Sequence, residues 1–351
     1  MRHSISPTSL TLLCTYRCTA ACSQCCFESN PRLRGQLDGD AMLQRISEAS
    51  RDFPDLRLVV FSGGEPLLLK EDLCRAVSHC TSLGLRSRIV SNGSWAKRME
   101  RARQTCTRLH GAGLSELNLS TGRDHQAWVA QDSVINAAEA AVDTGLRVLV
   151  TIETDTAESR CLAAMRSDAR VARLAENPLF GLQSNYWMPF HGGAPAREQT
   201  PDLEQLRKGC SQVFENVVVT PRDEVSACCG LTFEHIPEMR LGKCSGANLA
   251  ETYRQQGEDF LKHWLKVDGP YSIIERLLGD RAKTVLDGVV HQCQACAILH
   301  QDPDIRAELL QRHAEYVPDV MTRQAIGAAL QRAMQDATEV CLLYTSDAAD
   351  D

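Results

Sequence analysis

Several features that would direct a protein to a membrane or to nucleic acid are missing from this chain of 351 residues. No apolar run approaches the ~20 residues that a membrane-spanning helix needs. The first residues, Met1-Arg2-His3-Ser4, include no apolar signal-peptide segment. Aromatic residues make up only 5%, the net charge is −7, and no basic stripe carries interleaved aromatics, so nucleic acid is not an expected partner. We expect a cytoplasmic protein with a sizeable core and no membrane contact.

Cysteine, in contrast, is abundant, with 16 residues. In a reducing compartment, cysteines serve as metal ligands or small buried side chains more often than as disulfides. Cys74, Cys80, Cys106 and Cys161 occur singly in helical patterns, and we expect them to pack in the core.

Three further cysteines form a C-x3-C-x2-C pattern, Cys18-Thr-Ala-Ala-Cys22-Ser-Gln-Cys25. Four thiolates would complete a tetrahedral zinc site or saturate an iron–sulfur cluster, whereas three leave one metal position open for chemistry. Cys14 and Cys26 flank the trio, so a fourth local ligand remains an alternative at this point.

From residue 10 to about residue 190, short apolar runs alternate with amphipathic segments. The predicted strands are 9–13, 56–61, 85–91, 116–120, 147–153 and 181–187, and the predicted helices are 40–50, 70–82, 96–110, 132–143 and 157–176. Strand–helix repetition of this kind predicts a parallel sheet with right-handed crossovers. Six units are too few for an eight-fold barrel, so we expect an open, curved α/β arc.

Polar and glycine-rich motifs follow these strands, at the carboxyl edge where parallel sheets bind ligands. Ser62-Gly63-Gly64-Glu65-Pro66 follows the second strand, and its two glycines would let a ligand approach the backbone closely. Ser91-Asn92-Gly93 follows the third strand, and Ser120 begins a segment after the fourth that ends in Asp124-His125. Taken singly, each motif is equally typical of an ordinary turn.

In combination, the cysteine trio after strand one and Gly-Gly-Glu-Pro after strand two resemble the radical S-adenosylmethionine (radical SAM) superfamily over residues 10–195. The resemblance implies a partial (β/α)6 TIM-like barrel. It also implies a [4Fe–4S] cluster held by Cys18, Cys22 and Cys25, whose fourth iron binds the amino and carboxylate groups of S-adenosylmethionine. The implied contacts to that cofactor are Gly63, Gly64, Glu65, Pro66, Asn92 and Ser120.

The chemistry that the resemblance implies is one-electron cleavage of S-adenosylmethionine to methionine and a 5′-deoxyadenosyl radical, which abstracts hydrogen from the substrate. The electron would come from a reducing partner such as flavodoxin or ferredoxin. No catalytic acid or base is assigned from the sequence.

Beyond a Pro- and Gly-rich linker ending at Pro195, the pattern changes to a predicted β-hairpin over residues 217–229. The hairpin region and a later C-x2-C pair resemble the SPASM and twitch extensions of some radical SAM enzymes. Since residues 297–340 contain no cysteine, the resemblance implies one auxiliary cluster of the shorter twitch type. Its implied ligands are Cys210, Cys228 or Cys229, Cys293 and Cys296. A structural zinc on the same four cysteines is the alternative.

We therefore predict a radical SAM domain over residues 1–195, a smaller α+β auxiliary-cluster domain over 196–300 and a helical tail over 301–340. Residues 341–351 differ in composition and resemble translated read-through that is foreign to the native protein.

The leading hypothesis is an enzyme that crosslinks, oxidises or epimerises a ribosomally made peptide. With about nine residues before strand one, such a peptide would be held by a separate leader-peptide-binding protein or by the helical tail. The alternatives are a small-molecule substrate, maturation of another enzyme, and a non-catalytic zinc adaptor.

Overall fold

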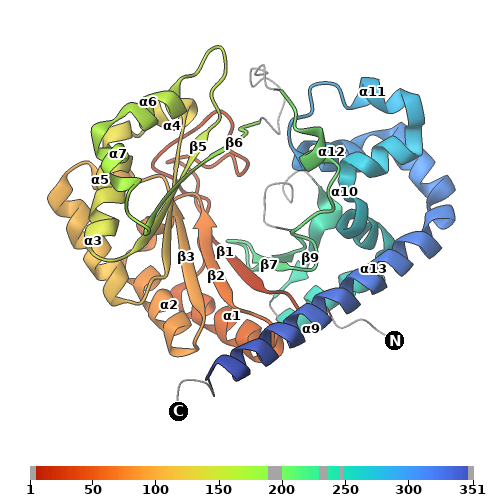
Figure 1. Ribbon diagram of the computed structural model, residues 1–351, viewed down its shortest axis with the longest axis horizontal. Coiled ribbons are helices and arrows are strands. Elements are labelled where there is room, and N and C mark those ends of the chain that lie inside the picture. The colour runs from red at the N-terminus through yellow and green to blue at the C-terminus, as the bar shows by residue number, and fades with distance from the viewer. Residues whose placement is uncertain (1–4, 189–199, 229–235, 245–247, 347–351) are drawn as a thin grey trace.

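The computed structural model describes residues 5–188, 200–228, 236–244 and 248–346 (Figure 1). Its strands are β1 (Ser9–Thr15), β2 (Leu58–Gly63), β3 (Arg86–Ser91), β4 (Glu116–Thr121), β5 (Arg147–Glu153), β6 (Phe180–Asn185), β7 (Asn216–Val219), β8 (Glu224–Ser226) and β9 (Arg240–Lys243). Its helices are α1 (Gly39–Asp52), α2 (Glu71–Ser82), α3 (Met99–Gly111), α4 (Arg123–Gln126), α5 (Gln131–Asp143), α6 (Cys161–Ser167), α7 (Ala169–Leu174), α8 (Leu203–Leu206), α9 (Leu249–Arg254), α10 (Phe260–Leu278), α11 (Ala282–Val285), α12 (Gln292–Gln301) and α13 (Pro303–Ser346).

The first six strands form the predicted open, parallel arc. They lie in the order β6-β5-β4-β3-β2-β1, and each strand pairs with its neighbour in parallel. The helices between them cover the outer face of the arc (Figure 1). This order is the one that consecutive right-handed crossovers produce, and the sheet does not close. The predicted fold class is therefore confirmed.

Local sequence explains why the helices begin and turn as they do. Asp38 caps α1 by accepting hydrogen bonds from the backbone N–H groups of Asp40 and Ala41. Met42, Ile46 and Ala49 then follow at helical spacing and are buried against the sheet. Where one helix is predicted over residues 157–176, the chain forms α6 and α7, because Asp168 leaves the helical conformation to cap α7.

The sheet continues beyond the sixth unit into the second part of the chain. β7 pairs in parallel with β1, and β8 and β9 add antiparallel strands, which gives a nine-stranded sheet. β7 and β8 form the predicted hairpin. Its turn is held to α1, because Arg45 Nε and Nη2 donate to the Asp223 carboxylate at 3.0 and 2.8 Å. The sheet therefore runs across the predicted boundary at residue 195.

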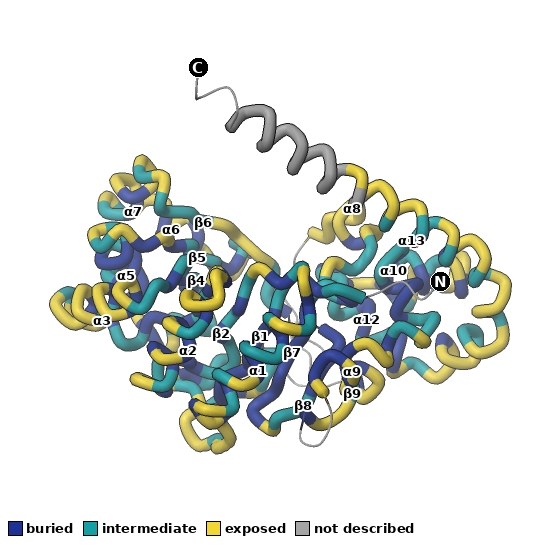
Figure 2. Tube along the Cα trace, turned by 90° about the horizontal axis from the view of Figure 1, so that it is seen from below, coloured by how far each residue is buried: buried dark blue, intermediate teal, exposed yellow. Residues whose placement is uncertain are grey.

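A second hydrophobic core lies under the C-terminal helices. Trp264 of α10 is fully buried and stacks on Tyr316 of α13, with ring centroids 4.5 Å apart. Leu13 and Tyr16, at the end of β1, belong to this same core. Figure 2 shows buried residues along the central strands and exposed residues on the outer sides of the helices.

The helical tail predicted for residues 301–340 lies in α13, which continues to Ser346 and so enters the segment predicted to be foreign. Among the described residues, no helix combines the length and apolarity needed to cross a membrane.

Candidate active site

A cavity of about 510 Å³ lies at the carboxyl edge of the parallel strands. Its wall combines the loop after β1, the ends of β2, β3, β4 and β6, and the start of α12. Most of the predicted site residues line it, namely Cys18, Cys22, Cys25, Gly63, Gly64, Asn92 and Ser120. Glu65 and Pro66 are buried instead. The parallel topology thus brings together side chains that the sequence separates by about a hundred residues.

The cysteine trio lies on a tightly folded loop. Cys25 N–H donates to Cys22 O at 3.2 Å, and Glu28 N–H donates to Cys25 O at 3.0 Å. Glu28 takes a left-handed conformation, with φ of 50°, so the chain reverses directly after the trio. The two flanking cysteines differ: Cys14 is fully buried in the core of the sheet, whereas Cys26 lines the cavity.

Burial and mutual proximity keep the thiols of Cys18 and Cys22 protonated unless a metal centre replaces their protons. Burial, together with the charges of Cys25 and Cys18, raises the pKa of the Cys22 thiol to about 12. Burial chiefly raises the pKa of Cys18 to about 11. Three thiolates in this place would repel one another unless a metal centre compensated their charge, so the donor set fits an iron–sulfur cluster. Within the described ranges, no three or more His, Cys, Asp or Glu side chains are arranged around a single metal ion.

The Gly-Gly pair clamps the end of β2 against the cysteine loop. Gly64 N–H donates to Thr15 O at 2.6 Å, and Glu65 N–H donates to Arg17 O at 2.9 Å. A Cβ on Gly63 would lie 2.6 Å from Thr15 O, and a Cβ on Gly64 would overlap the backbone carbonyl of Arg17. Glycine is therefore required here by the contact between two backbones. Both glycines also line the cavity.

Glu65 organises the loops after β2 and β3 from inside the protein. Its carboxylate accepts hydrogen bonds from Leu67 N–H at 3.0 Å and Asn92 N–H at 2.9 Å, and it lies 3.0 Å from Ser91 Oγ. Burial raises the pKa of this carboxyl to about 7, although the hydrogen bonds partly offset that effect. Pro66 begins the short helical turn Pro66–Leu69 that follows.

Asn92 ties the end of β3 to the cysteine loop. Its Nδ2 donates to Thr19 Oγ1 at 3.0 Å and lies 3.4 Å from Cys18 Sγ. Its Oδ1 accepts from Ser94 N–H at 2.9 Å. The side chain therefore orients Cys18 while one face of it lines the cavity.

Ser120, near the end of β4, and His125 of α4 also line the cavity. The His125 ring meets Trp187 edge-on, with ring centroids 4.6 Å apart. Burial lowers the pKa of His125 to about 4, so its imidazole is neutral at pH 7.

Sequence reasoning missed the polar floor of the cavity. Asn118 of β4, Thr151 of β5 and Gln183 of β6 form a continuous ladder, with side-chain hydrogen bonds of 3.1 Å between neighbours. Beside it, Arg88 is paired with Glu116 at 2.6 Å. Polar residues at alternating positions of otherwise apolar strands were the signal that could have identified this floor.

The second set of cysteines lies in and around the second core. Cys210, Cys228 and Cys296 pack in the same hydrophobic cluster, and Cys293 lies one turn before Cys296 on α12. Cys229, the alternative ligand, lies outside the described residues. His291, which the sequence did not single out as a ligand, caps α12 by accepting from Cys293 N–H and also lines the cavity. The C-x2-C pair therefore begins at the edge of the cavity.

Comparison with known proteins adds a related sequence. No family model matches the chain. The PqqA peptide cyclase of Xanthomonas oryzae pv. oryzae (strain MAFF 311018) is 33% identical over 118 residues, which cover 32% of this chain and 29% of the cyclase. The cyclase of strain KACC10331 / KXO85 matches to the same extent. The chain therefore aligns with less than a third of the length of these curated relatives.

Two solved structures share the fold over most of the chain. Native anSMEcpe with bound AdoMet (S-adenosylmethionine) has a TM-score of 0.54 at 13% identity, covering 91% of this chain and 100% of that one. Native anSMEcpe with bound AdoMet and the Cp18Cys peptide has a TM-score of 0.53 at 12% identity, covering 91% and 99%. At this identity the likeness concerns the fold, which includes the second part of the chain as well as the arc.

The open parallel sheet with a three-cysteine loop at its carboxyl edge is the arrangement that the radical SAM resemblance implies. The chain thus shares its fold with two AdoMet-bound structures, and a stretch of 118 residues is similar in sequence to the cyclase.

Proposed function

We propose that this protein cleaves S-adenosylmethionine reductively and uses the resulting 5′-deoxyadenosyl radical to abstract hydrogen from a peptide substrate. The observation that carries the proposal is the single cavity shared by the cysteine trio, the Gly-Gly turn, Asn92 and Ser120. Nothing in an ordinary zinc site requires the last three features.

In this proposal, Cys18, Cys22 and Cys25 hold a [4Fe–4S] cluster that supplies the electron for cleavage when S-adenosylmethionine is bound. Asn92 keeps Cys18 in place through its amide. The carbonyls of Gly63 and Gly64 accept hydrogen bonds from the ammonium group of the cofactor.

Other residues would bind and enclose the cofactor and substrate. Ser120 offers a hydroxyl to the ribose, and the edge-on His125–Trp187 pair forms an uncharged wall that excludes water. The polar floor of Asn118, Thr151 and Gln183 offers amide and hydroxyl groups that match the hydrogen-bonding groups of a peptide backbone.

A peptide substrate is supported by the nature of the related cyclase and by the peptide bound in a protein of the same fold. We further propose that Cys210, Cys228, Cys293 and Cys296 hold an auxiliary [4Fe–4S] cluster. Its support is that His291, which caps α12 two residues before Cys293, lines the cavity, so this cluster would lie near the place where an acceptor for the electron left after hydrogen abstraction is needed.

The test is anaerobic reconstitution of the wild type and of a Cys18/Cys22/Cys25→Ala variant, followed by measurement of iron, acid-labile sulfide and 5′-deoxyadenosine. We expect about eight iron per chain in the wild type and about four in the variant, which should form no 5′-deoxyadenosine. Cys161→Ala, which alters a half-buried cysteine of α6, is the matched control and should keep both iron and activity.

Cys293/Cys296→Ala separates the auxiliary site from the first, because it should lose about four iron while the trio keeps its own. Zinc in the wild type in place of the second four iron would make this site structural. Absence of iron and of 5′-deoxyadenosine in the wild type would refute the proposed activity.

A further inference from the structure

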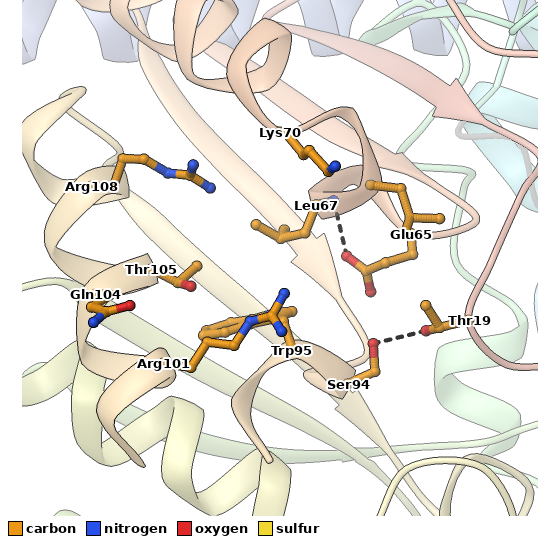
Figure 3. Close-up of a pocket in the computed structure, with 11 residues that line it drawn as sticks. Thr19, Glu65, Leu67, Lys70, Ser94, Trp95, Arg101, Gln104, Thr105 and Arg108 are labelled. Atoms are coloured by element: carbon orange, nitrogen blue, oxygen red, sulfur yellow. Dashed lines mark hydrogen bonds between the residues drawn. The ribbon is translucent and has the colours of Figure 1, made fainter. Parts of the chain in front are cut away.

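A second cavity, of about 500 Å³, is lined by Thr19 of the cysteine loop and by residues between Glu65 and Arg108 (Figure 3). Three cationic side chains line it: Arg101 and Arg108 from α3, and Lys70 from the start of α2. The two arginines are seven residues apart, which places them on one face of the helix, with Gln104 and Thr105 between them. We call this space the basic cavity.

The charges of the basic cavity are not compensated by the protein. Lys70, Arg101 and Arg108 are exposed, and none of them has an ion-pair partner in the part of the chain that the structure describes. The neighbouring arginines of α2 and α3 do have partners: Arg75 pairs with Asp40 at 2.6 Å and Arg103 with Asp143 at 3.6 Å.

Glu65 is the acidic residue among those lining the basic cavity, but the residue is only 1% exposed. Its carboxylate accepts hydrogen bonds from Leu67, Ser91 and Asn92. In a chain with a net charge of −7, three free cations around one opening create a local positive field that attracts an anionic partner.

The wall of the basic cavity is also the back of the cysteine loop. Thr19, adjacent to Cys18, is exposed in the basic cavity and donates to Ser94 Oγ at 2.8 Å. Asn92 Nδ2 bridges Thr19 Oγ1 and Cys18 Sγ. Between a partner in the basic cavity and Cys18 there would thus be only Thr19 and its hydrogen bonds. The cavity that the cysteine trio lines would stay free for substrate.

We propose that the basic cavity docks the acidic rim of a one-electron donor protein. The inference rests on the proposed function, because reductive cleavage needs an electron from outside. The donor is oxidised by one electron and the cluster held by the trio is reduced by one, with no bond or proton transferred. Leu67 and Trp95 give the opening an apolar floor that a protein partner can cover.

The experiment measures binding of flavodoxin, an acidic flavoprotein donor, to the reconstituted full chain at low and high ionic strength. The variants are Arg101→Glu, Arg108→Glu and the double variant. Arg166→Glu, which alters an exposed arginine of α6, is the charge-matched control. We expect the Kd of the double variant to rise at least about tenfold, the control to be unchanged, and wild-type binding to weaken with salt.

A second experiment measures the 5′-deoxyadenosine formed with dithionite as the reductant. Because dithionite is a small molecule that needs no binding surface, this experiment tests the proposed function independently of flavodoxin binding. The double variant should match the wild type with dithionite and fall behind it with flavodoxin. Absence of wild-type binding, or equal weakening by Arg166→Glu, would overturn the proposal. Inorganic phosphate that binds the basic cavity while flavodoxin does not would also overturn it, and would identify a small-anion site instead.

Discussion

Replacing Gly64 by alanine tests whether the Gly-Gly turn acts by holding the cysteine loop. A Cβ at residue 64 would overlap Arg17 O, lie 2.6 Å from Arg17 C and lie 3.1 Å from Cys18 N. All three are backbone atoms, so no side-chain rotation can relieve the overlap. The end of β2 and the cysteine loop must move apart.

The magnitude follows from what that separation disrupts. Forcing an extra methyl into a packed site destabilises a protein by about 1–3 kcal/mol. The movement also strains the bonds from Gly64 N–H to Thr15 O and from Glu65 N–H to Arg17 O, each worth about 1 kcal/mol. We expect the free energy of unfolding to fall by about 2–4 kcal/mol, and the displaced Cys18 to bind iron poorly.

The assay is urea unfolding of the apoprotein, followed by iron retention after reconstitution and desalting. Gly111→Ala is the matched control, because nothing lies within 4 Å of a Cβ at the end of α3. It should leave both quantities unchanged or raise the unfolding free energy slightly. A Gly64→Ala protein that is as stable as the control and retains full iron would refute this account of the turn.

Three further changes test other parts of the structure. Burial raises the pKa of Glu65 to about 7, so between about pH 4.5 and pH 7 the folded protein keeps a proton that the unfolded chain releases. This group therefore lowers the stability of the protein as the pH rises through that range. In Glu65→Gln, the midpoint of urea unfolding should depend less on pH over the same range. Arg45→Ala should lower the free energy of unfolding by about 2–3 kcal/mol. This is less than for a fully buried ion pair, because the Asp223 side chain is 30% exposed. A urea midpoint of Arg45→Ala equal to that of the wild type would show that the Arg45–Asp223 pair does not stabilise the protein. A fragment of residues 1–195 should be insoluble when expressed alone, because β1 loses its pairing with β7. Co-expression of residues 196–351 should restore its solubility. A soluble fragment that unfolds cooperatively would contradict this prediction.

The arc and the cysteine loop were predictable because each depends on local pattern. Apolar runs such as 58–61 alternate with helices whose starts carry caps such as Asp38, and the parallel connection rule then fixes the strand order. The gathering of the cysteine trio, Gly63, Asn92 and Ser120 follows from that order, since each lies at or just beyond the carboxyl end of a strand.

The polar floor and the basic cavity depend instead on which residues meet across elements. Thr151 and Gln183 contribute one hydrogen-bonding group each, and only strand register places them beside Asn118. The role of Glu65 was equally hidden, because whether a carboxylate faces a ligand or caps a buried turn depends on packing that spacing does not encode.

The parallel pairing of β1 with β7 changes how the two parts of the chain are understood. β1 lies between β2 and β7, and its two faces serve different cores: Leu10 and Leu12 pack in the core of the arc, while Leu13 packs in the second core. The loop that carries the cysteine trio starts where this strand ends. Its position therefore depends on both cores at once, so the part of the chain with the second set of cysteines supports the first site structurally, independently of any metal at those cysteines.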